Sequence, residues 1–163
     1  MKTQNKLQER LKDLIDQAGS KVLVNKKLTK EFVNYSFTVK KFDYFLDTGE
    51  LAYVNAKILN YTKYFKRILN TLDNDIHSRQ AVLSFNITNT HKPNCVVLMQ
   101  FLIRDEKLHT IVYSRSLDIL KKLYTDIDIA RRFSDKVCDR YFVTLDKITF
   151  HVASLHYYLE DLK

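Results

Sequence analysis

Residues that break regular structure are scarce in this chain, which has two glycines and one proline among 163 residues. Glycine supplies the positive backbone angles of tight turns, and proline interrupts helices and central strands. A chain this poor in both is expected to form mostly regular elements with few tight turns. Its length fits one domain, and its 45% of apolar residues is enough for a core. We therefore predict a single domain over residues 1–163.

The spacing of apolar residues divides the chain into helices and strands. Spacing of three and four residues predicts helices over residues 7–18, 50–72 and 118–143, the last with a break near Thr125. Runs of β-branched and aromatic residues predict strands over residues 21–24, 32–39, 81–87, 95–105, 107–115 and 147–154. Segments 95–105 and 107–115 form a predicted antiparallel hairpin, and residues after 154 are predicted to start a helix. This order predicts an α+β fold with a mainly antiparallel sheet flanked by helices.

The chain is basic, with a formal net charge of +8. This charge favours an anionic partner such as a nucleotide, a nucleic acid or a membrane surface, and the plain alternative is a soluble basic surface. No apolar run approaches the ~20 residues of a membrane helix, and the charged N-terminus lacks the apolar core of a signal peptide. Two cysteines, Cys95 and Cys138, do not make a disulfide framework. We expect a reducing, cytoplasmic setting and no membrane partner.

Basic and aromatic residues alternate in the predicted helix over residues 57–67. Nucleic acid is bound by cations that contact phosphates and by rings on which bases stack. The candidates for such contacts are Lys57, Lys63, Tyr64, Lys66 and Arg67. An amphipathic helix with a solvated charged face is the simpler interpretation, and from these residues alone we favour it.

A reactive thiol is the chemical feature to look for around Cys95, which opens a predicted strand. A thiol becomes nucleophilic when its pKa falls, which requires nearby positive charge and partial exposure. Arg115 supplies that charge if the hairpin brings it beside Cys95. Taken alone, each residue has an ordinary alternative, a buried thiol and a solvated turn. The histidines and cysteines lack the spacing of zinc ligands, and a predicted strand-to-helix junction separates His151 from His156, so we predict no metal site.

Four separated segments carry a more specific pattern. They read RQAVLSFN, PNCVVLMQFLIRD, YSRSLD and SLHYY, and they lie within residues 79–158. A glutamine follows the cysteine by five residues, an Arg-Ser-x-Asp motif follows it by twenty, and a His-x-Tyr pair lies forty-one beyond that arginine. In type and spacing these motifs resemble the central part of thymidylate synthase and deoxycytidylate hydroxymethylase. The resemblance implies a thymidylate synthase-like fold and covers about half of the chain.

The resemblance also implies a chemistry. Cys95 would attack carbon 6 of a pyrimidine, which makes carbon 5 a nucleophile toward a one-carbon donor. In a catalytically active member, that donor is methylenetetrahydrofolate. Arg115 would favour the thiolate and bind the phosphate of a nucleoside monophosphate, because guanidinium has the forked geometry that phosphate requires.

Further binding residues follow from the same resemblance. Ser116 would share the phosphate with the arginine, and Arg79 would reach the phosphate site of the other subunit, since the family works as a homodimer. Asp118 would contact the base through its backbone. His156 and Tyr158 would bind the sugar hydroxyl.

Asp126 bears on which base is bound, because the resemblance places it where thymidylate synthases carry Asn and the hydroxymethylases carry Asp. An amide matches the N–H donor and carbonyl acceptor of uracil. A carboxyl group that holds one proton matches the amino donor and bare ring nitrogen of cytosine. An unpaired buried polar edge costs roughly 1–3 kcal/mol, so the residue favours dCMP. The alternative is an aspartate that caps a helix or is solvated.

The chain also departs from the family pattern. Family enzymes are about 100 residues longer, beyond the usual size of one domain, and segments that handle folate and close the active site have no counterpart. Lys57 falls at the position of the family's catalytic glutamate, and Lys122 replaces a glycine before Asp126. General acid–base help is worth roughly 10²–10⁴ in rate, so one-carbon transfer would be residual. Two hypotheses result: a dCMP-binding protein that retains some carbon 5 chemistry, or a catalytically inactive member reused as a nucleic-acid-binding or regulatory protein.

Overall fold

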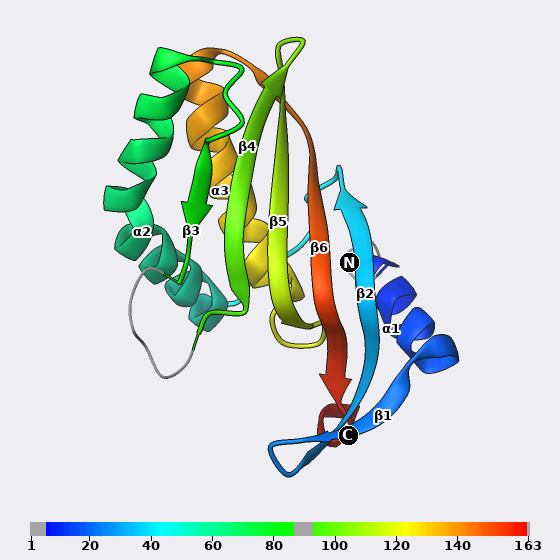
Figure 1. Cartoon of the computed structure of the whole chain (residues 1–163). Coiled ribbons are helices and arrows are strands. Elements are labelled where there is room, and N and C mark those ends of the chain that lie inside the picture. The colour runs from blue at the N-terminus through cyan, green and yellow to red at the C-terminus, as the bar shows by residue number, and fades with distance from the viewer. Residues whose placement is uncertain (1–5, 87–92, 163) are drawn as a thin grey trace.

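The computed structural model describes residues 6–86 and 93–162, which form one layer of helices against one sheet (Figure 1). The helices in these residues are α1 (Lys6–Ala18), α2 (Thr48–Asn74) and α3 (Leu123–Tyr141), and a 3₁₀ turn, η1 (Leu159–Leu162), follows the last strand. The strands are β1 (Ser20–Val24), β2 (Lys27–Val39), β3 (Val82–Ser84), β4 (Val96–Arg104), β5 (Lys107–Asp118) and β6 (Thr144–Tyr158). None of the described helices is long and apolar enough to cross a membrane.

The six strands make one sheet in the order β1-β2-β6-β5-β4-β3. Neighbouring strands are antiparallel except β5 and β6, which run parallel because α3 connects them as a crossover (Figure 1). The predicted α+β class with a mainly antiparallel sheet is therefore confirmed. The predicted hairpin is also present, with Val96 opposite Ser114 and Arg104 opposite Lys107.

Two tight hairpins form without glycine. The turns at Asn25-Lys26 and Asp105-Glu106 have positive φ at both residues, between 49° and 64°. Two-residue hairpins require such angles because their twist then matches that of the flanking strands. Asn and Asp tolerate the left-handed region better than other non-glycine residues. The scarcity of glycine therefore did not prevent tight turns between long strands.

An aromatic cluster joins the two long helices to the sheet. The ring of Phe65 on α2 lies 4.9 Å from that of Phe133 on α3 and 5.6 Å from that of Phe101 on β4. Phe85, just after β3, packs edge-on against Phe133 at 6.2 Å. All four side chains are buried. Because aromatic rings bury large apolar areas, this cluster fixes α2 and α3 relative to β4.

The predicted helix over residues 118–143 begins later than expected. Asp118 is the last residue of β5, residues 119–122 form a turn, and α3 starts at Leu123. The Asp118 carboxylate accepts hydrogen bonds from the backbone N–H groups of Leu120 (3.1 Å) and Lys121 (3.3 Å). An aspartate that bonds the backbone ahead of it favours a turn over a helix. The expected break near Thr125 is therefore wrong, and the break lies at this turn.

The predicted helix after residue 154 is also wrong for its first residues. Strand β6 continues to Tyr158, because Leu155 to Tyr158 pair with Phe32 to Thr29 of β2, and Leu155 and His156 also pair with Leu117 and Asp118 of β5. Pairing on both sides overrides local helix preference. His151 and His156 consequently lie on one strand. Ile87, the end of the predicted strand 81–87, lies outside the described residues.

One face of the sheet is left uncovered by the described helices (Figure 1). Val33 and Tyr113, large side chains on this sheet, are 65% and 39% exposed. The Tyr113 ring stacks on that of His151 at 5.2 Å, and His151 Nδ1 lies 2.7 Å from the Ser36 hydroxyl. Neighbouring side chains from three strands thus form a continuous, partly apolar surface.

Candidate functional site

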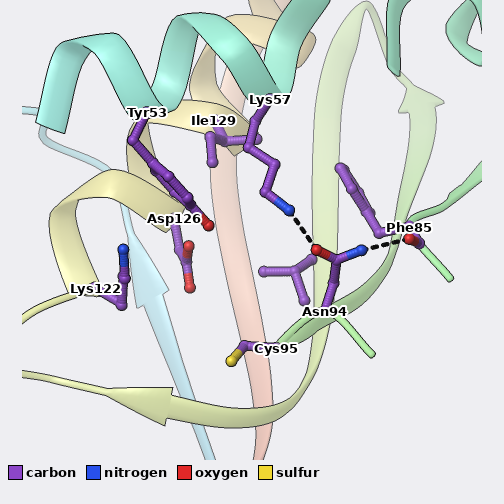
Figure 2. A pocket seen from close by; sticks show the side chains of 9 residues that line it. Tyr53, Lys57, Phe85, Asn94, Cys95, Lys122, Asp126 and Ile129 are labelled. Atoms are coloured by element: carbon purple, nitrogen blue, oxygen red, sulfur yellow. Dashed lines mark hydrogen bonds between the residues drawn. The ribbon is translucent and has the colours of Figure 1, made fainter. Parts of the chain in front are cut away.

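A pocket opens between the N-terminal halves of α2 and α3 and the start of β4 (Figure 2). It is lined by Tyr53, Lys57, Phe85, Asn94, Cys95, Val96, Lys122, Asp126 and Ile129. Counting the open space at its mouth, its volume is about 410 Å³. Its enclosed part is only about 60 Å³, below the roughly 300–1,000 Å³ of typical small-molecule pockets, so a ligand bound here would extend into the open mouth.

Helical spacing places the polar lining residues. Tyr53 and Lys57 are four apart on α2, so both project from one side of that helix toward the pocket (Figure 2). Lys122 and Asp126 are four apart at the start of α3, and the Lys122 ammonium lies 3.9 Å from the centre of the Tyr53 ring. The two helices therefore meet through a cation–π contact at the pocket wall.

Cys95 and Arg115 lie side by side at the pocket mouth. Arg115 Nη2 is 3.9 Å from Cys95 Sγ, and its backbone N–H donates to the Cys95 carbonyl at 2.9 Å. The guanidinium also donates to the carbonyls of Asn94 (3.1 Å) and Pro93 (2.8 Å), so it holds the segment that carries the cysteine. Cys95 is exposed. The structure thus brings together positive charge and access, the two features that a reactive thiol requires.

Asn94 organises the wall behind the cysteine. Its side-chain amide donates to the Tyr61 hydroxyl (3.0 Å) and the Phe85 carbonyl (2.6 Å), and its Oδ1 accepts from the Lys57 ammonium (Figure 2). These bonds fix the residue that precedes Cys95. Sequence reasoning missed Asn94, because no spacing rule connects it to residues of a helix more than thirty positions earlier.

Asp126 is the most unusual polar group of the pocket. Its residue is 4% exposed, and its Oδ2 has no hydrogen-bond partner among the described residues. Burial raises the pKa of Asp126 to about 7, although the ammonium groups of Lys122 and Lys57 act in the opposite direction. A buried polar atom without a partner costs free energy unless a proton or a ligand satisfies it. A carboxyl group of this kind in a cleft marks a candidate functional site.

The basic side chains of α2 do not all lie on the same side of the helix. Lys57 is directed into the pocket, and burial lowers its pKa, with Asp126 and Cys95 acting in the opposite direction. Lys63, Lys66 and Arg67 are exposed, and the Lys63 ammonium lies 4.7 Å from the ring centre of Tyr64. The five residues considered for nucleic-acid contact therefore do not form one surface.

A second group of predicted residues lies at the paired ends of β5 and β6. Asp118 is opposite His156, and the rings of His156 and Tyr158 are 5.4 Å apart. The ammonium groups of Lys27 and Lys121 lie 5.6 Å and 5.8 Å from the ring centre of Tyr158.

These residues do not line the pocket, but strand β5 connects them to it. Ser116 follows Arg115 on β5 and pairs with Ser154, two residues before His156. Arg79 is placed elsewhere, in the connection between α2 and β3, where its carbonyl accepts from Gln100 Nε2 at 2.8 Å. It lines a different hollow, together with residues such as Asn74 and His77. Of the predicted site residues, Cys95 and Asp126 thus line the pocket, and Arg115 lies beside Cys95.

Comparison with known families gives one match. The sequence pattern of the family described as thymidylate synthase matches residues 33–163, a range that includes the pocket and the ends of β5 and β6. No curated protein matches the chain significantly.

Proposed function

Because the chain belongs to the thymidylate synthase family, we propose that its pocket binds a pyrimidine nucleoside monophosphate, with dCMP preferred. The family transfers one-carbon groups to pyrimidine nucleotides. The observation that carries the proposal is the unpartnered, buried Oδ2 of Asp126 in the pocket that also contains Cys95. A ligand with a matching donor would satisfy that oxygen.

Cytosine provides the match in hydrogen-bonding terms. Its amino group would donate to one oxygen of Asp126, and its ring nitrogen would accept a proton held by the carboxyl group. With a pKa raised to about 7, Asp126 holds such a proton in a large fraction of molecules at neutral pH. The difference from uracil lies in the shared proton. Cytosine can take that proton at its ring nitrogen and then donates from both positions to the carboxylate, whereas uracil carries an N–H and a carbonyl there, so the ionised carboxylate could pair only with the N–H.

The remaining contacts are proposed along strand β5. Arg115 Nη1 has no hydrogen bond among the described residues, and with Ser116 it would bind the phosphate, because guanidinium carries five N–H donors. His156 and Tyr158 would bind the sugar. Cys95 would add to carbon 6 of the base, and its neighbour Arg115 supplies the positive charge near the sulfur.

Methylenetetrahydrofolate, the one-carbon donor that the family normally uses, does not fit the described pocket. The enclosed part of the pocket is only about 60 Å³, so it has no space for a second ring system beside a base. The wall next to the base site is also occupied by the ammonium groups of Lys57 and Lys122. The proposed function is therefore nucleotide binding with thiol addition to the base, and none of its steps uses a folate.

A homodimer is proposed through the uncovered sheet face. This face exposes Val33 and Tyr113, and exposed apolar surface of this kind commonly marks an interaction site. Arg79 lies away from the pocket of its own chain, which supports a role at a partner's phosphate site. The alternative function, nucleic-acid binding through Lys63, Tyr64, Lys66 and Arg67, rests on charge alone.

Replacing Asp126 with asparagine is expected to reverse the base preference. An amide held with its oxygen toward the ring nitrogen of the base and its NH2 toward the carbon 4 substituent matches uracil at both positions, and in that orientation it pairs with neither group of cytosine. A lost pairing of roughly 1–3 kcal/mol corresponds to a fall of about 5- to 150-fold in affinity for dCMP, with a gain for dUMP. Titration calorimetry with both nucleotides measures the change. Asp135→Asn, the same substitution at a half-exposed side chain of α3 outside the pocket, is the matched control. Equal affinity of the natural protein for dCMP and dUMP would argue against cytosine recognition by Asp126.

A further inference from the structure

We propose that Lys57 is the proton-transfer residue of the site, delivering a proton to carbon 5 of a pyrimidine whose carbon 6 is bonded to Cys95. This inference rests on the proposed function, and it replaces a role for Lys57 in nucleic-acid binding. It gives the protein a folate-independent activity, the exchange of the carbon 5 hydrogen with hydrogen from water.

The position of the ammonium group supports this role. Lys57 reaches from α2 across the pocket and donates to the side chain of Asn94, the residue before Cys95 (Figure 2). Its Nζ lies 5.8 Å from the ring centres of both Tyr53 and Tyr61, so aromatic rings flank it along the helix. Within the pocket it faces Cys95 across the space that a base would occupy, with Asp126 on the adjoining wall (Figure 2).

The contacts of Asn94 indicate that Lys57 is not needed to hold this side chain in place. The Asn94 amide already donates to the Tyr61 hydroxyl and the Phe85 carbonyl. These two bonds hold Asn94 without the lysine. The Lys57 amine is half-buried, and this partial burial lowers its pKa. A lowered pKa makes the Lys57 ammonium a better proton donor than an ordinary lysine.

The proposed exchange balances without a further reactant. The Cys95 thiolate forms a bond to carbon 6, and the electron pair of the C5=C6 double bond takes a proton from the Lys57 ammonium at carbon 5. The original hydrogen on carbon 5 then leaves as a proton to water at the pocket mouth. Its electron pair restores the double bond while the sulfur–carbon bond breaks and the thiolate is released. The Lys57 amine regains a proton from water, which completes the cycle.

The test uses dCMP labelled with tritium at carbon 5 and measures release of the label into water. Lys57→Met removes the cation, and Lys57→Arg keeps a cation that does not release its proton near neutral pH. Both variants are expected to lose exchange by about 10²- to 10⁴-fold, the scale of general acid catalysis. The affinity of Lys57→Arg for dCMP, measured by calorimetry, should stay within roughly threefold of the natural protein, because this variant keeps the charge that acts on Asp126. Lys63→Met, on the exposed side of the same helix, is the matched control and should change neither quantity.

A pH profile gives a second readout. Asp126, whose pKa is about 7, loses its proton in both proteins, so the effect of Lys57 is the further alkaline decline that the natural protein shows at saturating dCMP and that the residual activity of Lys57→Arg lacks. The other titratable groups facing Lys57 are Asp126 and Lys122 from α3, Cys95, and the tyrosines Tyr53 and Tyr61.

Each outcome separates this inference from the proposed function. Exchange that persists in Lys57→Arg, or a natural rate that does not decline at alkaline pH, overturns the role of Lys57. Binding of dCMP by the natural protein without any exchange also overturns it and leaves nucleotide binding intact. Failure of the natural protein to bind dCMP removes the proposed function itself.

Discussion

Cys95→Ser is expected to abolish carbon 5 exchange in dCMP while leaving nucleotide binding nearly unchanged. A serine hydroxyl at this position is a far weaker nucleophile than a thiol near neutral pH. The loss should be on the order of 10⁴-fold, the scale on which enzymes lose activity when their nucleophile is removed. Tritium release from carbon 5 measures the rate, and calorimetry with dCMP shows that the pocket remains intact.

Cys138→Ser provides the matched control for this experiment. Cys138 lies on α3 outside the pocket, and burial raises the pKa of its thiol to about 11. A thiol with so high a pKa is inert at neutral pH, so this variant should keep full exchange activity. Alkylation with iodoacetamide should likewise modify the exposed Cys95 first. Unchanged exchange in Cys95→Ser would rule out addition of this sulfur to the base.

Asp126 is expected to make the ligand-free protein less stable as the pH rises from about 4 to about 7. The pKa of Asp126 is raised from 3.8 to about 7 in the folded protein, so between these values the folded state holds a proton that the unfolded state has released. Stability therefore falls as the pH rises through this interval. The difference of about three pH units, at roughly 1.4 kcal/mol each, amounts to a loss on the order of 4 kcal/mol.

Urea unfolding of the natural protein and of Asp126→Asn across this pH range isolates the effect. The asparagine variant cannot lose a proton at this position. The difference in free energy of unfolding, variant minus natural protein, should therefore be larger at pH 8 than at pH 4. Asp128 acts in the opposite direction, because hydrogen bonds from Arg131, Tyr44 and Arg132 outweigh burial and lower its pKa. That contribution is common to both proteins and cancels in the comparison. Parallel curves for the two proteins would show that the Asp126 carboxyl titrates normally.

The parts of the fold that local patterns define were predictable from the sequence. The hairpin of β4 and β5 follows from two apolar runs joined by Asp105-Glu106, and the amphipathic stripe of α1 follows from residues such as Leu11 and Ile15, both fully buried. Element ends set by long-range pairing were not predictable. The local sequence of residues 155–158 predicts the start of a helix. These residues are instead held in the sheet by β2, which lies more than a hundred residues earlier in the chain, and by β5, about forty residues earlier.

The site divides in the same way. The motif spacing pointed to Cys95, Arg115 and Asp126; the structure places Cys95 and Asp126 in the lining of one pocket and Arg115 beside Cys95. The sequence alone did not show that Lys57 points into the pocket, because basic and aromatic residues alternate all around this part of α2. The sequence did contain one indication. Lys57 lies four residues from both Tyr53 and Tyr61, and Lys122 lies four residues before Asp126, so each set shares one side of its helix. Asn94 gave no signal, because its role depends on where α2 and Phe85 meet.

Titration calorimetry of the natural protein with dCMP tests the central claim most directly, with a short single-stranded oligonucleotide titrated in parallel. We expect saturable binding of one dCMP per chain that is weakened when Asp126 becomes asparagine, and no comparable binding of the oligonucleotide at physiological salt. Heat from the oligonucleotide alone, falling steeply as salt is added, would instead indicate binding through phosphate contacts on the basic surface. That result would contradict a nucleotide pocket between α2, α3 and Cys95.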